Sequence, residues 1–404
     1  WTPVIPGEEV VVEIIVSNKE QNAVKNQIEL SSINVGYKGF FGQELDRSGA
    51  CNVDVVCEEG DDWQDEIQCV AVISTGGSTF CTGFMVNNTS QDRTPYFMTA
   101  NHCGVTSSGA AASLVTYWNY ENSYCRVPGS SDSGGAGDGQ LNQFNTGATL
   151  LATGSTSDYT LVVLNDSPED VWEVSYCGWD ATGNDADQAI GIHHPQTDEK
   201  RISFEDQPTT TTSYLGEAVP GAGTHVRVED WDLGTTEPGS SGSPLFNQNH
   251  QVIGQLHGGY ASCTSQTSDW YGKFSVSYAA ALEEHLDSAG TGQLTLSTLP
   301  GTGMSVSPGE DVLHICTSPC FNPDPSEVVY TVTNNSPEQI SCRADTVNNA
   351  GFILLNGQSS VNFNLASGAS VDIVATVQGS FFPNGIYEEV VRVTDKTNNR
   401  SVDR

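Results

Sequence analysis

The stretch Pro238-Gly239-Ser240-Ser241-Gly242-Ser243-Pro244 decides how the rest of this sequence is interpreted. Glycines bracket a serine there and leave the backbone free to turn sharply. Such a turn projects the Ser241 hydroxyl and aims backbone N–H groups at one point, as acyl transfer needs: a nucleophile beside an oxyanion hole. Gly239 and Ser241 are the expected N–H donors. A glycine- and serine-rich hairpin without chemistry would look the same, so the interpretation depends on partner residues elsewhere.

A histidine that follows a short apolar strand is the first candidate partner. The stretch is Phe97-Met98-Thr99-Ala100-Asn101-His102-Cys103-Gly104. A general base must be held within hydrogen-bond reach of its nucleophile, and a disulfide from Cys103 to Cys81 would staple the loop that carries His102. A lone histidine is more often structural, but the strand and the adjacent cysteine favour a functional one.

An aspartate that begins an apolar run supplies the third part, in Ser157-Asp158-Tyr159-Thr160-Leu161-Val162-Val163-Leu164. Buried there, Asp158 could accept the imidazole N–H of His102 and fix its tautomer. An aspartate at this position is often only a turn residue. However, the chain order His102, Asp158, Ser241 is that of chymotrypsin and differs from the subtilisin and α/β-hydrolase orders. The spacing predicts the first two residues in one β-barrel and the serine in a second.

Residues 48–300 resemble the bacterial lysyl endopeptidases of the trypsin/chymotrypsin superfamily. The resemblance implies an all-β, chymotrypsin-like double β-barrel in which His102, Asp158 and Ser241 form the catalytic triad. It is carried by the stretches Cys51–Cys57, Thr99–Gly104, Tyr117–Tyr120, Ser157–Leu161, Gly178–Asp180, Ile192–Pro195, Glu199–Ser203, Thr236–Pro244 and Gly254–Gly259.

The primary specificity pocket departs from that of trypsin. In trypsin-like enzymes its acid lies six residues before the nucleophile, and that position is Thr235 here. In the lysyl endopeptidases the acid comes from a later stretch, so Asp269 is the expected partner of a P1 ammonium, unless it is only a solvent-exposed loop residue. By resemblance, His257 lines the same region. Tyr214 replaces the pocket-side tryptophan of the family, which bears on how strictly lysine is preferred.

The cysteines indicate an oxidising compartment. Eight of the eleven lie between Cys51 and Cys263, dispersed and without C-x-x-C pairs, which is typical of disulfides in a secreted protein. The other three cysteines lie after Cys263, and because their number is odd, one thiol is expected to be free or paired to another chain. The resemblance implies the pairs Cys51–Cys263, Cys57–Cys125 and Cys81–Cys103. We predict that the additional Cys69 and Cys177 also pair with each other. The three downstream cysteines are Cys316, Cys320 and Cys342.

Charge and hydropathy limit the partners. The formal net charge of −35 repels phosphate backbones, so nucleic acid is not an expected partner. A solvated surface suited to a salty exterior explains this acidity, and steering of basic peptides is the alternative. No run of about 18 apolar residues exists, so no membrane span is expected.

Three segments follow one another along the chain. Residues 1–47 resemble the end of the family's propeptide, released near Arg47, and Trp1 is not an initiator, so we expect a piece of a longer precursor or a processed form. Residues 48–300 hold short strands, such as Tyr159–Leu164 and His225–Val228, and a late helical run, Ser277–Leu286. Residues 301–404 alternate with the period of strands and resemble small bacterial β-sandwich modules of the BACON or Ig-like kind.

Zymogen activation is expected to differ from that of chymotrypsin. There an aspartate directly before the nucleophile pairs with a newly cut N-terminus. Ser240 stands at that position here, and no Ile-Val-Gly-Gly start is present. We therefore expect activation without this ion pair.

The sequence as a whole predicts a secreted, extracellular serine endopeptidase that acts on peptides or proteins, with no metal or cofactor required. The competing interpretation is a non-catalytic adhesion or carbohydrate-binding protein built on an inactive protease fold. An intact triad argues against it. The ligand of the third segment stays open.

Overall fold

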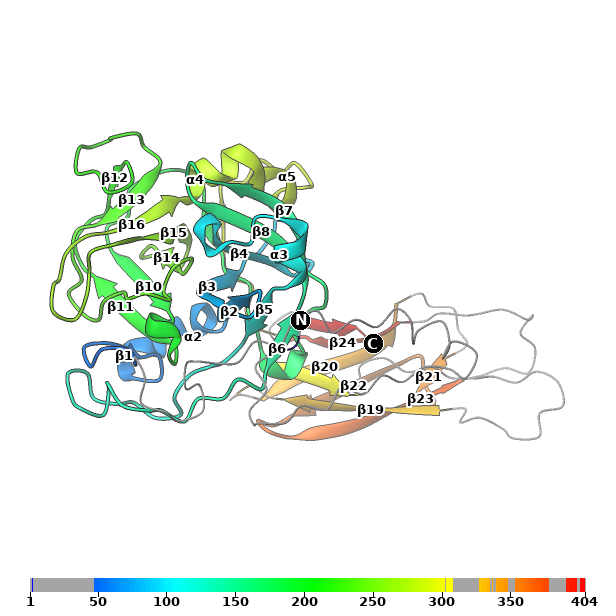
Figure 1. Cartoon of the computed structure of the whole chain (residues 1–404). Coiled ribbons are helices and arrows are strands. Elements are labelled where there is room, and N and C mark those ends of the chain that lie inside the picture. The colour runs from blue at the N-terminus through cyan, green and yellow to red at the C-terminus, as the bar shows by residue number, and fades with distance from the viewer. Residues whose placement is uncertain are drawn as a thin grey trace, which may run out of the picture. The chain divides into compact units, whose positions relative to one another are not determined.

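The structure is a computed structural model that describes Thr2 and residues 47–301, 303–307, 327–334, 336, 339–347, 353–377, 390–397 and 400–403. The chain divides into two compact units: Trp1–Pro168 with Tyr176–Leu299, and Glu169–Ser175 with Pro300–Arg404 (Figure 1). The expected propeptide end, residues 1–47, lies outside the described residues except for Thr2 and Arg47.

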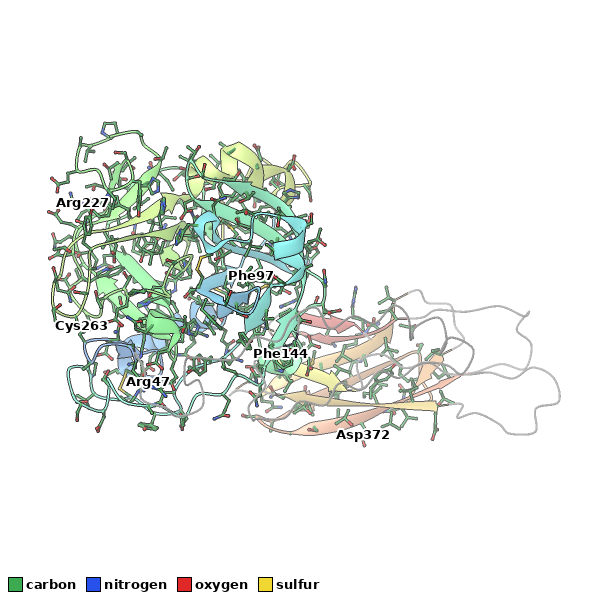
Figure 2. All side chains as sticks on the ribbon, in the orientation of Figure 1. Arg47, Phe97, Phe144, Arg227, Cys263 and Asp372 are labelled. Atoms are coloured by element: carbon green, nitrogen blue, oxygen red, sulfur yellow. A yellow bond between two sulfur atoms is a disulfide. The ribbon has the colours of Figure 1, made fainter. Side chains whose placement is uncertain are left out.

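One half of the first unit is a seven-stranded antiparallel sheet. Its strands are rich in β-branched and aromatic residues, which suit a pleated, half-buried surface. Phe97, labelled in Figure 2, packs edge-on against Trp118, with 5.8 Å between ring centroids. In spatial order the strands are β6 (Phe144–Thr146), β5 (Val115–Tyr117), β2 (Val70–Thr75), β3 (Thr79–Met85), β4 (Tyr96–Ala100), β8 (Tyr159–Leu164) and β7 (Ala148–Gly154).

The other half is a ten-stranded sheet around a separate core that includes Trp231, Leu245 and Tyr271. Together the two sheets form the chymotrypsin-like double β-barrel, which confirms the predicted fold class. In spatial order the strands are β1 (Val53–Asp54), β11 (Arg201–Glu205), β10 (Ala189–His193), β14 (Pro244–Phe246), β15 (Val252–Gly259), β16 (Asp269–Lys273), β13 (His225–Val228) and β12 (Thr210–Thr212), with β9 (Trp179–Asp180) and β17 (Thr295–Leu296) at the side.

The late helix begins earlier than the sequence pattern indicated. It comprises α4 (Phe274–Ser277), a π-helical stretch η5 (Tyr278–Leu282) and α5 (Glu283–Leu286). The earlier start has a tertiary cause, because the buried Phe274 ring stacks on Trp179 at 5.8 Å. None of the helices in the described part of the chain is long and apolar enough to cross a membrane. The other short helices are η1 (Glu58–Trp63), α2 (Gln64–Ile67), η2 (Asn101–Cys103), α3 (Ser108–Ala112), η3 (Asp170–Trp172) and η4 (Pro195–Thr197).

Four disulfides hold the first unit, and they are the four pairs expected from the sequence. The widest links residues 212 positions apart and ties the start of the unit to the loop between β15 and β16. The pairs are Cys51–Cys263, Cys57–Cys125, Cys69–Cys177 and Cys81–Cys103.

The second unit is a β-sandwich, as predicted. Two four-stranded antiparallel sheets share one core, to which Val332 contributes from one sheet and Ala344 from the other. Cys342 is buried in this core and has no disulfide partner among the described residues, whereas Cys316 and Cys320 lie outside them. The BACON or Ig-like resemblance stays a prediction. One sheet contains β18 (Met304–Ser307), β19 (Glu327–Asn334), β23 (Ser370–Val377) and β21 (Ile353–Leu355), and the other β22 (Ser360–Leu365), β20 (Ile340–Thr346), β24 (Val391–Asp395) and β25 (Arg400–Asp403).

Candidate active site

The turn before β14 presents Ser241. Gly239 and Gly242 have φ angles of +98° and +84°, which residues with a side chain rarely adopt. A Cβ on Gly242 would also collide with the Thr82 carbonyl oxygen. Among the hydrogen bonds of the described residues, neither the Gly239 N–H nor the Ser241 N–H has an acceptor. Two free donors beside a serine hydroxyl are what an oxyanion hole requires.

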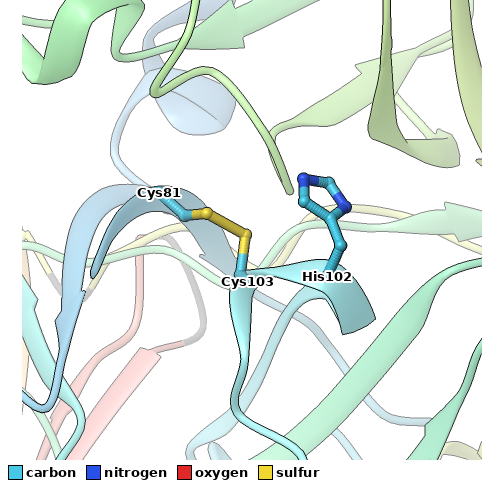
Figure 3. Close-up of side chains that lie close together, drawn as sticks. All are labelled: Cys81, His102 and Cys103. Carbon is cyan, nitrogen blue, oxygen red and sulfur yellow. A yellow bond between two sulfur atoms is a disulfide. The ribbon is translucent and has the colours of Figure 1, made fainter.

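His102 is delivered to this turn by β4 and the short helix η2. Figure 3 shows the Cys81–Cys103 disulfide beside His102, whose ring projects away from the bond. Thr82, the residue after Cys81, hydrogen-bonds to the serine turn of the other barrel. Its N–H donates to the Ser241 carbonyl (2.8 Å), and its hydroxyl donates to the Gly239 carbonyl (2.9 Å). The disulfide therefore fixes the histidine loop to the strand that holds the serine turn.

Asp158 holds His102 at two points. Its Oδ2 lies 2.7 Å from His102 Nδ1, and its Oδ1 accepts the His102 backbone N–H at 3.0 Å. The carboxylate is buried, and the residue has a φ of +54°, a strained conformation for a residue other than glycine. Gln255 of β15 helps to hold this backbone by donating to the Ser157 and Asp158 carbonyls at 2.6 and 3.2 Å.

The structure therefore brings His102, Asp158 and the Ser241 turn to the junction of the two barrels. The Ser241 hydroxyl makes no hydrogen bond to the His102 ring within the part of the chain that is described. Such bonds are often long in unliganded enzymes and tighten when substrate binds.

A second histidine approaches the same aspartate. His257 Nε2 lies 3.7 Å from Asp158 Oδ2, and the His257 ring lies 5.4 Å from the His102 ring. Tyr214 stacks on His257 with 3.6 Å between ring centroids and an angle of 6°. The two residues expected beside the pocket, Tyr214 and His257, thus contact each other and border the His102–Asp158 pair.

His225, which the sequence did not single out, continues this network. Its Nε2 lies 2.9 Å from His257 Nδ1, and its Nδ1 lies 2.9 Å from the Thr224 hydroxyl. Burial lowers the pKa of His225 to about 4 and also lowers the pKa of His257, so both rings are neutral at pH 7. The Asp158 carboxylate favours the tautomer in which His257 Nε2–H faces it. His257 Nδ1 then accepts from His225, and His225 accepts from Thr224.

Asp269 begins β16, between Val228 of β13 and Gly259 of β15. It is buried, with 1% of its surface exposed, which contradicts a loop residue in solvent. Its Oδ2 accepts the Trp231 indole N–H at 2.8 Å and the Thr236 hydroxyl at 2.7 Å. The sequence did not indicate Trp231 or Thr236, because neither belongs to a local motif with Asp269.

The other oxygen of this carboxylate is unsatisfied. Asp269 Oδ1 has no hydrogen-bond partner among the described residues. A Cβ on Gly259 would collide with Oδ1, so the absent side chain leaves the carboxylate open toward β15. Burial raises the pKa of Asp269, and hydrogen bonds from Trp231 and Thr236 lower it in part. The Ala261 backbone has a smaller lowering effect on this pKa without forming a hydrogen bond of ordinary geometry.

Two side-chain groups in this region have the composition of a metal site. In Cys81, His102 and Cys103, both sulfurs are bonded to each other, and only a thiolate ligates a metal. In His102, Asp158 and His257, the carboxylate is already hydrogen-bonded to the His102 ring. The first group is therefore explained by the Cys81–Cys103 disulfide beside His102, and the second by the His102–Asp158 hydrogen bond.

The sequence also matches a described family. Residues 45–272, more than half of the chain, match the family described as lysyl endopeptidase, C-terminal domain. The chain belongs to the lysyl endopeptidase family. This confirms the resemblance stated for residues 48–300.

One relative is the lysyl endopeptidase of Pseudomonas aeruginosa, which is 30% identical over 306 residues. The match covers 69% of this chain and 62% of that relative, so the chain spans less than two thirds of the relative's length. Among solved structures, the VesB protease of Vibrio cholerae is 12% identical, with coverage of 84% and 94% and a TM-score of 0.34. A Glu endopeptidase is 16% identical, with coverage of 53% and 88% and a TM-score of 0.34. TM-scores this low carry no argument about the chain.

Proposed function

We propose that this chain is a serine endopeptidase that hydrolyses peptide bonds through an acyl-enzyme. The observation that supports this best is the two-point hydrogen bonding of His102 to the buried Asp158, beside a turn whose Gly239 and Ser241 N–H groups have no acceptor in the described part of the chain. A non-catalytic protein would have no need for this combination.

In the proposed reaction, His102 takes the proton of the Ser241 hydroxyl as the oxygen attacks the scissile carbonyl. The Gly239 and Ser241 N–H groups stabilise the oxyanion, and Asp158 stabilises the imidazolium. His102 then gives the proton to the leaving amine. Water then attacks the acyl-enzyme ester while His102 takes its proton, and His102 returns the proton to Ser241 as the acid product leaves. These roles require no metal or cofactor.

For substrate preference we propose lysine, or a basic residue, at P1, bound by Asp269. A buried carboxylate with one unpaired oxygen favours a cation. Trp231 and Thr236 orient the carboxylate by holding Oδ2, and this leaves Oδ1 for the ammonium. Tyr214 and His257 would line the approach to this pocket.

We further propose that the protein is secreted, with residues 1–47 the end of a propeptide, residues 48–300 catalytic and residues 301–404 an accessory domain. Four disulfides support an oxidising compartment. Proteins or peptides are the proposed partners.

Labelling with a fluorophosphonate tests the reaction, because the reagent forms a covalent adduct only with an activated serine. We expect the wild-type chain to be labelled and Ser241→Ala to remain unlabelled. A wild-type chain that is folded, processed and still unlabelled would overturn the enzyme assignment in favour of an adhesion or carbohydrate-binding protein.

Product sequencing on a mixed peptide library tests the P1 preference. We expect cleavage after lysine to dominate in the wild type and this dominance to disappear in Asp269→Asn. Equal cleavage after many residue types by the wild type would remove Asp269 from its proposed role while leaving the reaction itself intact.

A further inference from the structure

We propose that Ser48-Gly49, the segment directly after the proposed propeptide end at Arg47, is a clamp that holds the oxyanion-hole turn in its active shape. This proposal rests on the proposed function. It assigns positioning roles to Asp198 and Glu237, two carboxylates that flank the turn and accept hydrogen bonds from the clamp. They take over the task that an ammonium–aspartate ion pair performs in chymotrypsin.

The residue beneath the turn cannot form that ion pair. Ser240 Oγ lies 2.8 Å from His193 Nδ1, and His193 Nε2 lies 3.0 Å from the Ser203 hydroxyl. Complete burial lowers the pKa of His193 to about 3, so the ring is neutral. The support under the nucleophile is therefore a chain of neutral hydrogen bonds, and charged support must come from the sides.

The first side is Asp198. Its Oδ2 accepts the backbone N–H and the hydroxyl of Ser48 at 3.1 and 3.0 Å, and its Oδ1 accepts from the Arg47 guanidinium at 2.9 Å. Burial acts to raise the pKa of Asp198, but hydrogen bonding with Glu199 and the charge of Arg47 lower it overall. Asp198 is therefore an anion whose partners come from a segment 150 residues away in the sequence.

Asp198 is connected to the oxyanion hole through η4, the short helix directly before it. Gln196 of η4 donates its N–H to the Pro238 carbonyl at 2.6 Å. A Cβ on Gly239 would lie 2.6 Å from Thr197 N, so η4 packs directly on the peptide that presents the Gly239 N–H. A displacement of Asp198 would thus be transmitted to an oxyanion donor.

The second side is Glu237, two residues before Gly239. Its carboxylate accepts the Gly49 N–H at 3.0 and 3.2 Å, and its carbonyl accepts the Ser240 N–H at 3.0 Å inside the turn. Asn52 donates to the same carboxylate at 3.4 Å. The clamp therefore supports the turn directly through Glu237 and indirectly through Asp198 and η4.

The position of the clamp is fixed covalently. Cys51, two residues after Gly49, is bonded to Cys263, and Figure 2 labels Arg47 and Cys263 on the same side of the first unit. A Cβ on Gly49 would collide with the Cys263 sulfur and approach Glu237 Oε1 to 2.9 Å. Glycine is thus needed at this position for the segment to reach both carboxylates.

Two variants of the processed, active enzyme test the proposal: Asp198→Asn and Glu237→Gln. Because the clamp sets the direction of oxyanion donors, we expect kcat to fall by about 10- to 100-fold in the two carboxylate variants, with KM changed by less than about threefold. Glu284→Gln, an exposed carboxylate on α5, is the matched control and should leave both constants unchanged.

A peptidyl boronic acid separates positioning from general damage. Its adduct with Ser241 places an oxygen in the oxyanion hole, so its inhibition constant should weaken in parallel with kcat/KM, while fluorophosphonate labelling still proceeds at a reduced rate. If the wild type is active and both carboxylate variants keep kcat and boronate affinity within twofold, the clamp is overturned. If the wild type itself neither labels nor cleaves, the proposed function has failed instead.

Discussion

Asp269 illustrates at the scale of one residue how a binding group is held at a cost to stability. The carboxylate is buried and half satisfied, and a charge in that position is unfavourable until a cation arrives. In Asp269→Asn the amide oxygen can still accept from Trp231 and Thr236. We expect kcat/KM for lysine substrates to fall about 100-fold, while the free energy of unfolding rises by about 1 kcal/mol. Steady-state kinetics and urea unfolding measure both.

Asp230→Asn is the matched control for this variant, because Asp230 is an exposed aspartate after β13. It should change neither quantity. Loss of stability together with loss of activity in Asp269→Asn would contradict the binding role, because that result would make the carboxylate a structural group.

The same residue predicts a pH dependence. An ammonium binds the ionised carboxylate, which exists above the pKa of Asp269, and burial raises that pKa above its ordinary value of 3.8. On acidification, affinity for lysine substrates should therefore be lost at a higher pH than an ordinary aspartate would give. We expect this acid limb in the pH profile of kcat/KM of the wild type and its absence in Asp269→Asn. An identical limb in the variant would assign it to another group.

At the scale of elements, β13 and β15 bring His225 and His257 together, and β8 begins directly after Asp158, the aspartate that His257 approaches. We predict that His225→Ala lowers kcat/KM by about two- to tenfold, because His257 loses the donor that fixes its tautomer toward Asp158. Asp230→Asn, which changes an exposed aspartate two residues after β13, is the control. This control should stay within twofold of the wild type, and equal losses in the two variants would refute a role for the tautomer.

At the scale of the whole molecule, Cys51–Cys263 ties the segment before β1 to the loop between β15 and β16 and anchors the clamp. Because this disulfide closes a long loop, it strongly restricts the unfolded chain. We expect the double variant Cys51→Ser, Cys263→Ser to lose about 2–5 kcal/mol of unfolding free energy, measured by urea denaturation of the first unit. Activity at a temperature where the variant is fully folded should also fall, because Gly49 loses its anchor beside Glu237. Full activity there would separate the disulfide from the clamp.

Local features of the structure were predictable from local sequence. The strands Tyr159–Leu164 and His225–Val228 have the expected bounds because their apolar, β-branched runs end at turn residues. The helix beginning at Phe274 was placed three residues too late, because its first turn is fixed by packing on Trp179, which no periodicity reports. Tertiary packing overrides propensity at such ends.

The sequence by itself identified the candidate residues His102, Asp158 and Ser241, since each belongs to a short motif whose chemistry depends on neighbours in the chain. The family resemblance implied the double barrel, three of the disulfide pairs and the candidate residue Asp269. The tertiary structure alone decided which groups surround them: Trp231 and Thr236 on Asp269, His225 behind His257, and Ser48 and Gly49 on the carboxylates beside the turn. These contacts join residues up to 188 positions apart. A hydrogen bond between such distant residues depends on how the sheets pack, and no local pattern encodes that.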